Sequence, residues 1–145
     1  KERKKDKSHH REKVNYLGLD VGEKRVGMAL ANDVARIPSP LDIVSPEELM
    51  NSLEKILSQH DVQKIIIGLP KRLDGTDSEQ TVKIRAFAGV LKEQTNIEIN
   101  FADEALTSRD ARELIANNKK YKHRKYYDDL SACYILEEYL RRSII

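Results

Sequence analysis

Residues 62–69 (VQKIIIGL) form the stretch on which the choice of fold class depends. From Ile65 onward the run is almost wholly apolar and rich in β-branched residues, without the alternation of a strand that has one face in water. A short strand with both faces covered is typical of the centre of a parallel sheet, which helices flank on both sides. The sequence therefore predicts an α/β fold with this strand near its middle.

The residues before this strand predict one helix and, further upstream, three strands. Residues 45–48 (SPEE) combine an N-cap serine, a proline at the first helical position and a glutamate at the third, and apolar residues follow at helical spacing. Residues 14–20 (VNYLGLD) and 25–31 (RVGMALA) are expected to pair as a hairpin. Residues 36–44 predict an edge strand, because their two prolines cannot donate to an interior ladder.

Helices and strands alternate after residue 69. We expect a helix up to about residue 94, a strand over residues 97–102, a short helix over residues 107–117 and a last helix from about residue 128. The inward face of the first of these helices is expected to comprise Val82, Ala86, Val90 and Phe87. The order β-β-β-α-β-α-β-α-α predicts a five-stranded mixed sheet with helices on both faces.

Length and composition indicate one domain. The chain has 145 residues, of which 39% are hydrophobic, with a single cysteine and no tryptophan. One cysteine excludes an intrachain disulfide framework and favours a reducing compartment. The apolar runs are only a few residues long, against the roughly 20 that span a bilayer, and no signal-peptide core is present. We therefore expect a soluble cytoplasmic protein with no membrane partner.

The formal net charge of +2 conceals an uneven distribution. Residues 1–13 hold seven Lys or Arg and three acidic residues, so residues 14–145 carry a net charge of −2. The first 13 residues contain no apolar side chain and cannot dock by burial, which predicts a disordered basic arm followed by a single domain over residues 14–145. The arm could contact nucleic acid or be a solvated tail without a role, and the sequence leaves both readings open.

Three carboxylates lie where α/β proteins place their chemistry. Asp20 ends the first predicted strand, Glu104 follows the last one, and Asp128 opens the final helix. Carboxylate oxygens suit Mg²⁺, which can orient water and balance charge on a phosphate. Each acid alone could instead form a turn or cap a helix, whereas the three together favour a metal site. The chain has no HExxH, GxSxG or GxxxxGK[ST] motif that would indicate other chemistry.

Four ordered motifs in the chain match those of one known family. Residues 18–29 (GLDVGEKRVGMA) resemble GxDxGxKxxGxA, the opening motif of the YqgF-type (RuvX-type) bacterial RNase-H-like proteins. Residues 66–70 (IIGLP) with 74–76 (DGT) resemble its IVGLPxxxDGT segment, and residues 103–108 (DEALTS) its DERLTS motif. Its DxxAAxxIL helix is similar to residues 128–136 (DDLSACYIL). The resemblance covers roughly residues 14–140.

This resemblance implies an RNase H-like fold and a metal-dependent endonuclease. The family is associated with maturation of the 5′ end of pre-16S ribosomal RNA and, by its fold, with resolution of Holliday junctions. By position, the resemblance implies that Asp20, Glu104 and Asp128 are the catalytic acids and the ligands of Mg²⁺ or Mn²⁺. Alignment on the IL pair of the last motif selects Asp128 over Asp129.

One position departs from the family pattern. The arginine that follows the glutamate in DERLTS is Ala105 here, so a cation beside the acids is missing. An arginine there could stabilise charge on the scissile phosphate, and its loss would then weaken catalysis. Four cations could replace it: Lys24, Arg25, Lys71 and Arg72. The sequence does not choose among them.

The spacing of the strands raises a question about the acids. In an RNase H sheet the first strand neighbours the fourth, and the fifth lies beyond it. At about 4.8 Å between strands, the backbones of Asp20 and Glu104 would lie about 10 Å apart. Gly68, near the end of the fourth strand, would leave room between them, and we expect Gly68→Val to abolish metal-dependent activity without unfolding the protein.

A basic segment precedes Asp128. Residues 119–127 (KKYKHRKYY) contain five Lys or Arg, three tyrosines and no acid. Basic groups neutralise phosphates and tyrosines stack on unpaired bases, although the segment could also be a solvated loop. The predicted nucleic-acid-binding residues are Lys24, Arg25, Lys71, Arg72, Lys122, Arg124 and Lys125. The expected partners are pre-ribosomal RNA or branched DNA, bound by a monomer or a weak homodimer.

Two rival functions come from other classes. Residues 19–22 (LDVG) also resemble the first phosphate loop of actin-like and Hsp70-like ATPases, which need a second such domain. Tight ATP binding would favour that function. Ala105 also leaves open a catalytically weak nucleic-acid-binding protein, which binding without metal-dependent cleavage would reveal.

Overall fold

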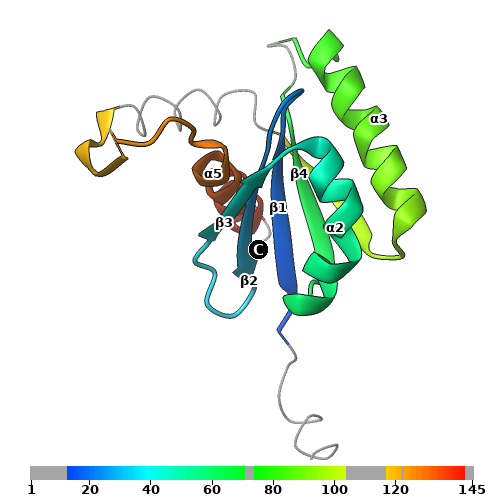
Figure 1. The fold of residues 1–145 in the computed structure, drawn as a ribbon, viewed down its shortest axis with the longest axis horizontal. Coiled ribbons are helices and arrows are strands. Elements are labelled where there is room, and N and C mark those ends of the chain that lie inside the picture. Colours follow the sequence, from blue (N-terminus) through cyan, green and yellow to red (C-terminus); the bar gives the residue numbers. More distant parts are fainter. Residues whose placement is uncertain (1–12, 71–73, 104–116, 122, 143–145) are drawn as a thin grey trace, which may run out of the picture.

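The computed structural model describes residues 13–70, 74–103, 117–121 and 123–142. Its strands are β1 (Asn15–Val21), β2 (Val26–Asn32), β3 (Ser39–Val44), β4 (Lys64–Leu69) and β5 (Glu98–Asp103). Its helices are α2 (Pro46–Gln59), α3 (Glu79–Gln94) and α5 (Asp128–Arg142), with a 3-10 turn, η1 (Lys119–Tyr121) (Figure 1). The helix predicted over residues 107–117 lies almost wholly outside the described residues, as does the basic arm apart from Lys13.

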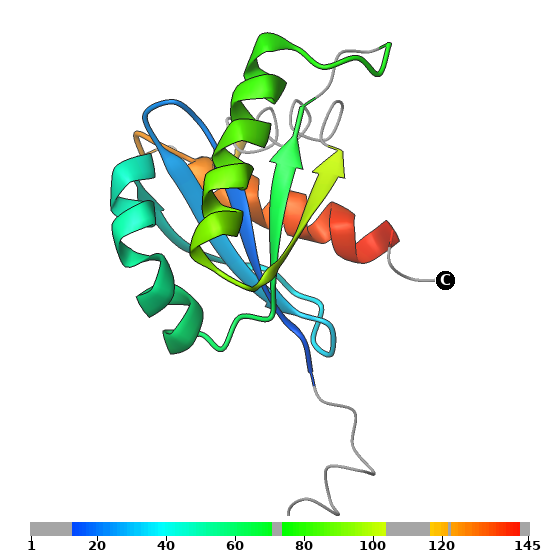
Figure 2. The ribbon, with the colours of Figure 1, turned by 90° about the vertical axis from the view of Figure 1, so that its right-hand side faces the viewer.

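The five strands form one mixed sheet in the order β3-β2-β1-β4-β5. β1 pairs antiparallel with β2, and β2 pairs antiparallel with β3. β4 runs parallel to both of its neighbours, β1 and β5. α2 and α3 cover one face of the sheet and α5 crosses the other (Figure 2). The predicted five-stranded mixed sheet with helices on both faces is confirmed.

The central strand is buried on both faces, as its sequence predicted. Ile65 and Ile67 belong to the core under α2 and α3, whereas Ile66 belongs to the core under α5. All three side chains are fully buried. Burial of each isoleucine side chain contributes about 2–3 kcal/mol to the stability of the fold. This strand therefore packs strongly against both cores.

α2 begins where its sequence signals predict. The hydroxyl of Ser45 accepts a hydrogen bond from the Glu48 amide at 3.1 Å, and the Glu48 carboxylate accepts one from the Ser45 amide at 3.0 Å. Leu49, Leu53 and Leu57 then form the buried stripe. This capping box fixes the direction in which the helix leaves the end of β3.

The predicted inward face of α3 is wrong. Val82 and Val90 are 57% and 45% exposed, Ala86 is also exposed, and only Phe87 packs partly against the core. The side chains that are buried instead are Thr81, Ile84, Ala88 and Leu91. The Thr81 hydroxyl bonds to Ser78 and to the carbonyl oxygen of Pro70, so its burial leaves no polar group unsatisfied. Because the Thr81 hydroxyl keeps its hydrogen bonds when buried, the larger Ile84 and Leu91 determine which face of α3 turns inward.

α5 lies close to the opposite face of the sheet. Its buried residues Ala132, Ile135 and Leu136 pack with Tyr16 and Ile66. A Cβ atom on Gly18 of β1 would lie 2.5 Å from Cγ of Leu136, so this approach requires glycine at position 18. Among the described residues, no helix has the length and apolar composition needed to cross a membrane.

Candidate active site

Asp20 lies one residue before the end of β1 and faces α5. Strand alternation places it on the same face as Tyr16 and Gly18, both of which meet that helix. Its partner on β2 is Gly27. Leu19 pairs with Ile67, so Asp20 is level with Gly68 on β4, which in turn pairs with Ala102 on β5. Asp20 therefore lies within a row of small residues (Gly27, Gly68, Ala102), hereafter the small-residue row.

The small-residue row bears on the distance between Asp20 and the end of β5. The register places Gly68 between Asp20 and the end of β5, where the sequence required a position without bulk. Glu104 itself lies one residue beyond the last described residue of β5 and outside the described residues. The effect of Gly68→Val therefore stays a prediction.

Asp128, the first residue of α5, lies directly on Gly27. A Cβ atom at position 27 would lie 1.9 Å from the carbonyl oxygen and 2.0 Å from the carbonyl carbon of Asp128. Only glycine allows this approach, because the obstructing atoms are backbone atoms at the start of a packed helix. Since Gly27 is the direct neighbour of Asp20 across the β1–β2 pair, the contact brings two of the three candidate acids together.

Arg25 binds the side chain of Asp128. Its Nε donates a hydrogen bond to Oδ2 of Asp128 at 3.0 Å, and the two side chains are 37% and 24% exposed. The guanidinium carbon lies 3.9 Å from the ring centroid of Tyr126, within the range of a cation–π interaction. A turn closed by the Gly22 amide and the Arg25 carbonyl oxygen, at 2.9 Å, holds Arg25 at the start of β2.

The neighbouring acid, Asp129, has a different environment. Its side chain is only 9% exposed and accepts a bond from Nη2 of Arg124 at 2.7 Å. Its other oxygen accepts a bond from the Leu130 amide at 2.9 Å. The bond to Asp129 raises the pKa of Arg124 above its ordinary value. Both carboxylate oxygens of Asp129 are thus engaged within the protein, which agrees with choosing Asp128 as the candidate ligand.

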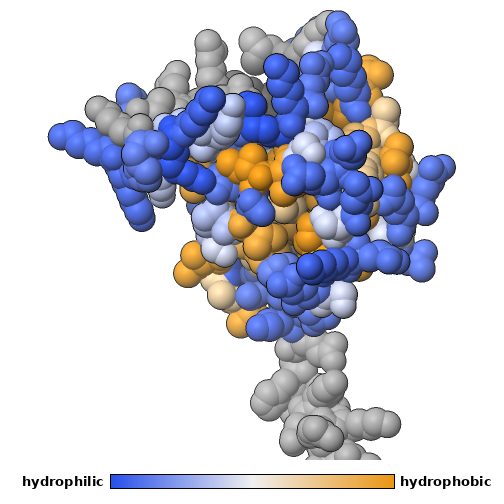
Figure 3. All heavy atoms as spheres, in the orientation of Figure 1, coloured by the Kyte–Doolittle hydropathy of each residue, from blue (hydrophilic) through white to orange (hydrophobic). Residues whose placement is uncertain are grey.

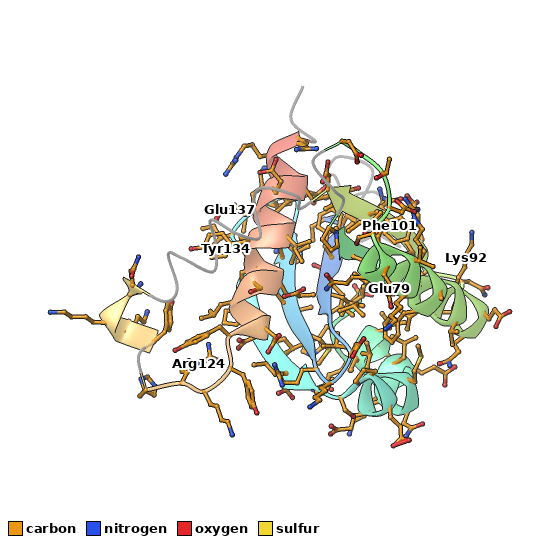
Figure 4. All side chains as sticks on the ribbon, turned by 90° about the horizontal axis from the view of Figure 1, so that it is seen from above. Glu79, Lys92, Phe101, Arg124, Tyr134 and Glu137 are labelled. Atoms are coloured by element: carbon orange, nitrogen blue, oxygen red, sulfur yellow. The ribbon has the colours of Figure 1, made fainter. Side chains whose placement is uncertain are left out.

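The basic segment before α5 is folded over part of its length. The Tyr127 hydroxyl donates to the Tyr121 carbonyl oxygen at 2.9 Å, and the Arg124 amide donates to the same residue at 3.0 Å. Lys125 Nζ lies 5.4 Å from the centroid of the Tyr126 ring. The segment projects from the body of the protein on a strongly hydrophilic side, and Arg124 lies between η1 and α5 (Figures 3 and 4).

The structure describes only part of the predicted site. Glu104, Lys71, Arg72 and Lys122 lie outside the described residues. Lys24 and Lys125 are exposed, whereas Arg25 and Arg124 are half-buried and bound to acids. Across the described ranges no group of three or more His, Cys, Asp or Glu could hold a metal ion. Asp20 and Asp128 nevertheless supply the hard oxygen donors that Mg²⁺ prefers, so the residues present fit such an ion.

The sequence did not distinguish Tyr126 from the other tyrosines of the basic segment, and it gave Gly27 no role beyond its place in the opening motif. Tyr126 lies two residues before a candidate acid, within a basic segment. Gly27 is the third glycine of the opening motif, and its spacing from Asp20 places it opposite that acid once the hairpin is drawn. Its contact with α5 depends on tertiary packing and could not be inferred.

A cavity of about 820 Å³ lies on the other face of the sheet. Its lining includes Gly22 and Glu23 from the β1–β2 turn and Lys83 and Phe87 from α3. Lys83 Nζ bonds to the Glu23 carboxylate at 2.7 Å across this region. The candidate acids face α5, so this cavity is separate from them.

A family model described as "RuvX: Holliday junction resolvase" matches residues 14–142. The chain belongs to the RuvX family. Relatives named "Putative pre-16S rRNA nuclease" include proteins from three bacteria. The Syntrophus aciditrophicus protein is 38% identical over 132 residues, covering 88% of each chain. The Orientia tsutsugamushi protein is 37% identical over 134 residues, covering 90% of this chain and 85% of its own. The Lactobacillus acidophilus protein is 31% identical over 136 residues, covering 88% and 96%.

Solved structures place this RuvX-family chain in the RNase H-like fold. Thermus thermophilus RuvC in complex with a Holliday junction substrate has a TM-score of 0.55, 10% identity, and coverage of 90% of this chain and 96% of RuvC. Fowlpox virus resolvase, in complex with Holliday junction DNA, has a TM-score of 0.54 and 15% identity, with coverage of 91% and 100%. The predicted fold and family are confirmed.

Proposed function

We propose that this protein is a metal-dependent endonuclease that processes the 5′ end of pre-16S ribosomal RNA in the cytoplasm. The observation that carries the proposal is the contact of Asp128 with Gly27, which places two acids from opposite ends of the chain side by side on the sheet. The names of its relatives support the RNA substrate.

Asp20, Asp128 and Glu104 would hold Mg²⁺ or Mn²⁺. When bound, such ions lower the pKa of water to give a nucleophile and balance the charge that develops on a phosphate. The fixed backbone of β1 and the start of α5 hold Asp20 and Asp128 in place. The small-residue row places no large side chain beside Asp20 on the neighbouring strands.

The residues around the acids serve to bind the nucleic acid. Lys24, in the β1–β2 turn, and Lys125, three residues before Asp128, are exposed cations that can neutralise phosphates of the nucleic acid. Tyr126, which is 39% exposed, can stack on an unpaired base. Lys71, Arg72 and Lys122, which lie outside the described residues, are proposed to bind nucleic acid as well. Arg124 contributes by supporting the segment, because its guanidinium binds Asp129.

A metal titration of RNA cleavage tests this function. The wild-type protein is expected to cleave a pre-16S RNA fragment at its 5′ region with Mg²⁺ or Mn²⁺ and not with EDTA. Asp20→Asn and Asp128→Asn should each lower the rate by at least about 100-fold, since each removes a negative charge and one of the two oxygen donors of the side chain. Asp61→Asn is the matched control, because Asp61 is exposed and its backbone φ of 50° suits asparagine. The absence of metal-dependent cleavage by the wild type would refute the proposal.

The second candidate function is resolution of four-way DNA junctions. The family model carries that description, and the two resolvase structures share the fold. Paired cuts across a junction need two active sites, so this function requires a dimer, whereas we expect a monomer or a weak homodimer. Cleavage of a synthetic junction, measured beside the RNA assay with the molar mass from light scattering, separates the two functions. Faster cleavage of the junction by a stable dimer would favour the resolvase.

A further inference from the structure

Among the residues that the structure describes, Arg25 is a cation in direct contact with a candidate catalytic acid. Four cations could replace the arginine that is absent at Ala105, and two of them, Lys71 and Arg72, lie outside the described residues. Lys24 is exposed on the β1–β2 turn. Of these two described candidates, Arg25 contacts an acid of the site: its Nε lies 3.0 Å from Oδ2 of Asp128.

The contacts of Arg25 use one edge and one face of its guanidinium group. Nε donates to Asp128, and the Tyr126 ring covers a face at 3.9 Å. Among the described residues, the terminal nitrogens Nη1 and Nη2 of Arg25 have no hydrogen-bond partner. The side chain is also 37% exposed, so these nitrogens can meet a ligand from solvent.

Charge and geometry at this position fit a phosphate. A guanidinium has five donors in a rigid fork, so it can bind a carboxylate through Nε and a phosphate oxygen through Nη at the same time. Stacking on Tyr126 restricts the plane of the fork before any ligand arrives. Lys125, also near the Tyr126 ring, adds a second positive charge beside it.

We propose that Arg25 is a catalytic residue whose terminal nitrogens bind the scissile phosphate while its Nε holds Asp128. The proposal rests on the nuclease function proposed above. Because Asp128 would hold the metal, a phosphate bound beside that acid is the one undergoing cleavage, and not a flanking phosphate. Arg25 would then supply, from the β1–β2 turn, the charge that Ala105 cannot supply. Tyr126 would act as a positioning residue through Arg25.

Steady-state kinetics on a pre-16S RNA fragment test the role of Arg25. Arg25→Gln is expected to lower kcat by about 100-fold with little change in KM, since the lost interaction strengthens as charge develops on the phosphate. Arg25→Lys keeps the charge without the fork and should recover part of that loss. Arg85→Gln is the matched control, because Arg85 also combines a carboxylate, Asp77 at 2.9 Å, with a ring, Phe101 at 5.4 Å. Phe101 lies beside α3, on the part of the sheet away from η1 (Figure 4).

A direct metal-binding measurement separates catalysis from support of Asp128. Calorimetric titration of the RNA-free protein with Mn²⁺ should give an affinity for Arg25→Gln equal to, or a few-fold tighter than, that of the wild type, because a positive charge has been removed. The kcat of this variant should stay low at saturating Mn²⁺. If Mn²⁺ binding weakens and excess Mn²⁺ restores kcat, Arg25 only orients Asp128 and the proposal is wrong.

Failure of this proposal can be distinguished from failure of the nuclease function. If the wild type cleaves and Arg25→Gln cleaves equally well, only the role of Arg25 is lost. If the wild type does not cleave RNA with either metal, the nuclease function fails, and the proposal for Arg25 fails with it.

Discussion

At the scale of single residues, the site depends on positions where a side chain is absent. Gly27 lets the first residue of α5 lie against β2, and the carbonyl of Asp128 occupies the space that a Cβ atom would fill. The obstructing atoms are backbone, so they cannot move aside as the tip of a side chain could. The identity of residue 27 therefore affects both the stability of the helix–sheet contact and the position of an acid.

Gly27→Ala should destabilise the protein and impair the site together. We expect the free energy of unfolding to fall by about 3 kcal/mol or more, because the start of α5 must shift away from the sheet. Urea unfolding and the cleavage assay measure the two effects. Gly89→Ala is the control: a Cβ atom there meets nothing within 4 Å, and this helical position should gain about 0.5–1 kcal/mol. A stable, fully active Gly27→Ala protein would contradict the contact.

Cys133 is predicted to be chemically inert. Burial, followed by the negative charges of Asp129 and Glu137, raises the pKa of its thiol to about 12. At pH 8 only about one thiol in ten thousand is then the reactive thiolate. A colorimetric thiol reagent at pH 8 should modify the folded protein far more slowly than the urea-unfolded protein. Equal rates in the two states would show that the thiol is accessible and not suppressed.

At the scale of elements, α5 connects the acid pair to the basic segment. Its first residue lies on β2, and its second, Asp129, binds Arg124 of that segment. The Ser131 amide also donates to the Tyr127 carbonyl oxygen at 3.0 Å, which joins the helix to the residues before it. A displacement of the basic segment would therefore also shift Asp128.

Removal of Arg124 should destabilise the protein, because it leaves a buried negative charge unpaired. Arg124→Met leaves Asp129 buried without its cation, and we expect a loss of roughly 3 kcal/mol in the free energy of unfolding. Asp129→Leu added to Arg124→Met should recover most of that loss, because no charge then remains unpaired. Urea unfolding of the two single variants and the double variant gives the coupling energy. An additive double variant would mean that the pair does not interact in solution.

The helices and strands could be predicted from local sequence signals. The side of a helix that is buried could not always be predicted in this way. Ser45 and Glu48 defined the start of α2, and the apolar run at Ile65 defined the central strand. For α3, the valines at positions 82 and 90 suggested the wrong inward face. Thr81 is buried there because partners distant in sequence satisfy its hydroxyl, and no local pattern reveals such partners.

In the candidate site, too, some features could be predicted from the local sequence, whereas others depend on tertiary packing. Asp20 and Asp128 were selected by their places at the ends of predicted elements and by motif resemblance. The bond from Arg25 to Asp128 joins residues 103 positions apart, and it depends on how α5 lies across the sheet. A sequence can suggest that Arg25 is basic and near Asp20, but not which acid it binds.

At the scale of the whole molecule, stability should depend on pH mainly below pH 5. Hydrogen bonds lower the pKa values of Glu23, Glu48 and Asp74, with Lys83, Ser45 and Thr76 as the respective partners. A lowered folded-state pKa gives stability that is present above the ordinary value near 4 and is lost as the pH falls through the lowered value. The Glu23 bond also raises the pKa of Lys83, whose contribution is lost only at strongly alkaline pH.

Urea midpoints at intervals from pH 3 to pH 8 measure this dependence. We expect a plateau from about pH 5 upward and a decline below about pH 4. Glu48→Gln should show a smaller decline, since one of the three carboxylates no longer titrates. Glu54→Gln, an exposed change on the same helix, serves as the control. A decline of the same size in Glu48→Gln and the wild type would contradict a role for the capping carboxylate.

RNA binding should weaken as salt rises, in spite of a net charge of only +2. The affinity depends on the phosphates neutralised locally, with a log–log salt slope of about −0.7 for each contact with single-stranded RNA. Combining Lys24→Gln with Lys125→Gln should therefore make the slope shallower by about 1.4. Fluorescence anisotropy in EDTA at several salt concentrations measures it. Lys55→Gln on α2 should leave the slope unchanged, and an unchanged slope in the double variant would exclude these lysines from the interface.

The position of Asp128 late in the chain affects when activity can arise during translation. Synthesis proceeds from the N-terminus at roughly 5–20 residues per second, so Asp128 is added roughly 5–20 s after Asp20. Until α5 has left the ribosome and docked on β2, a nascent chain has Asp20 in its hairpin without Asp128 beside it. A nascent chain would thus lack the paired acids until the docking of α5 on β2 brings Asp128 beside Gly27.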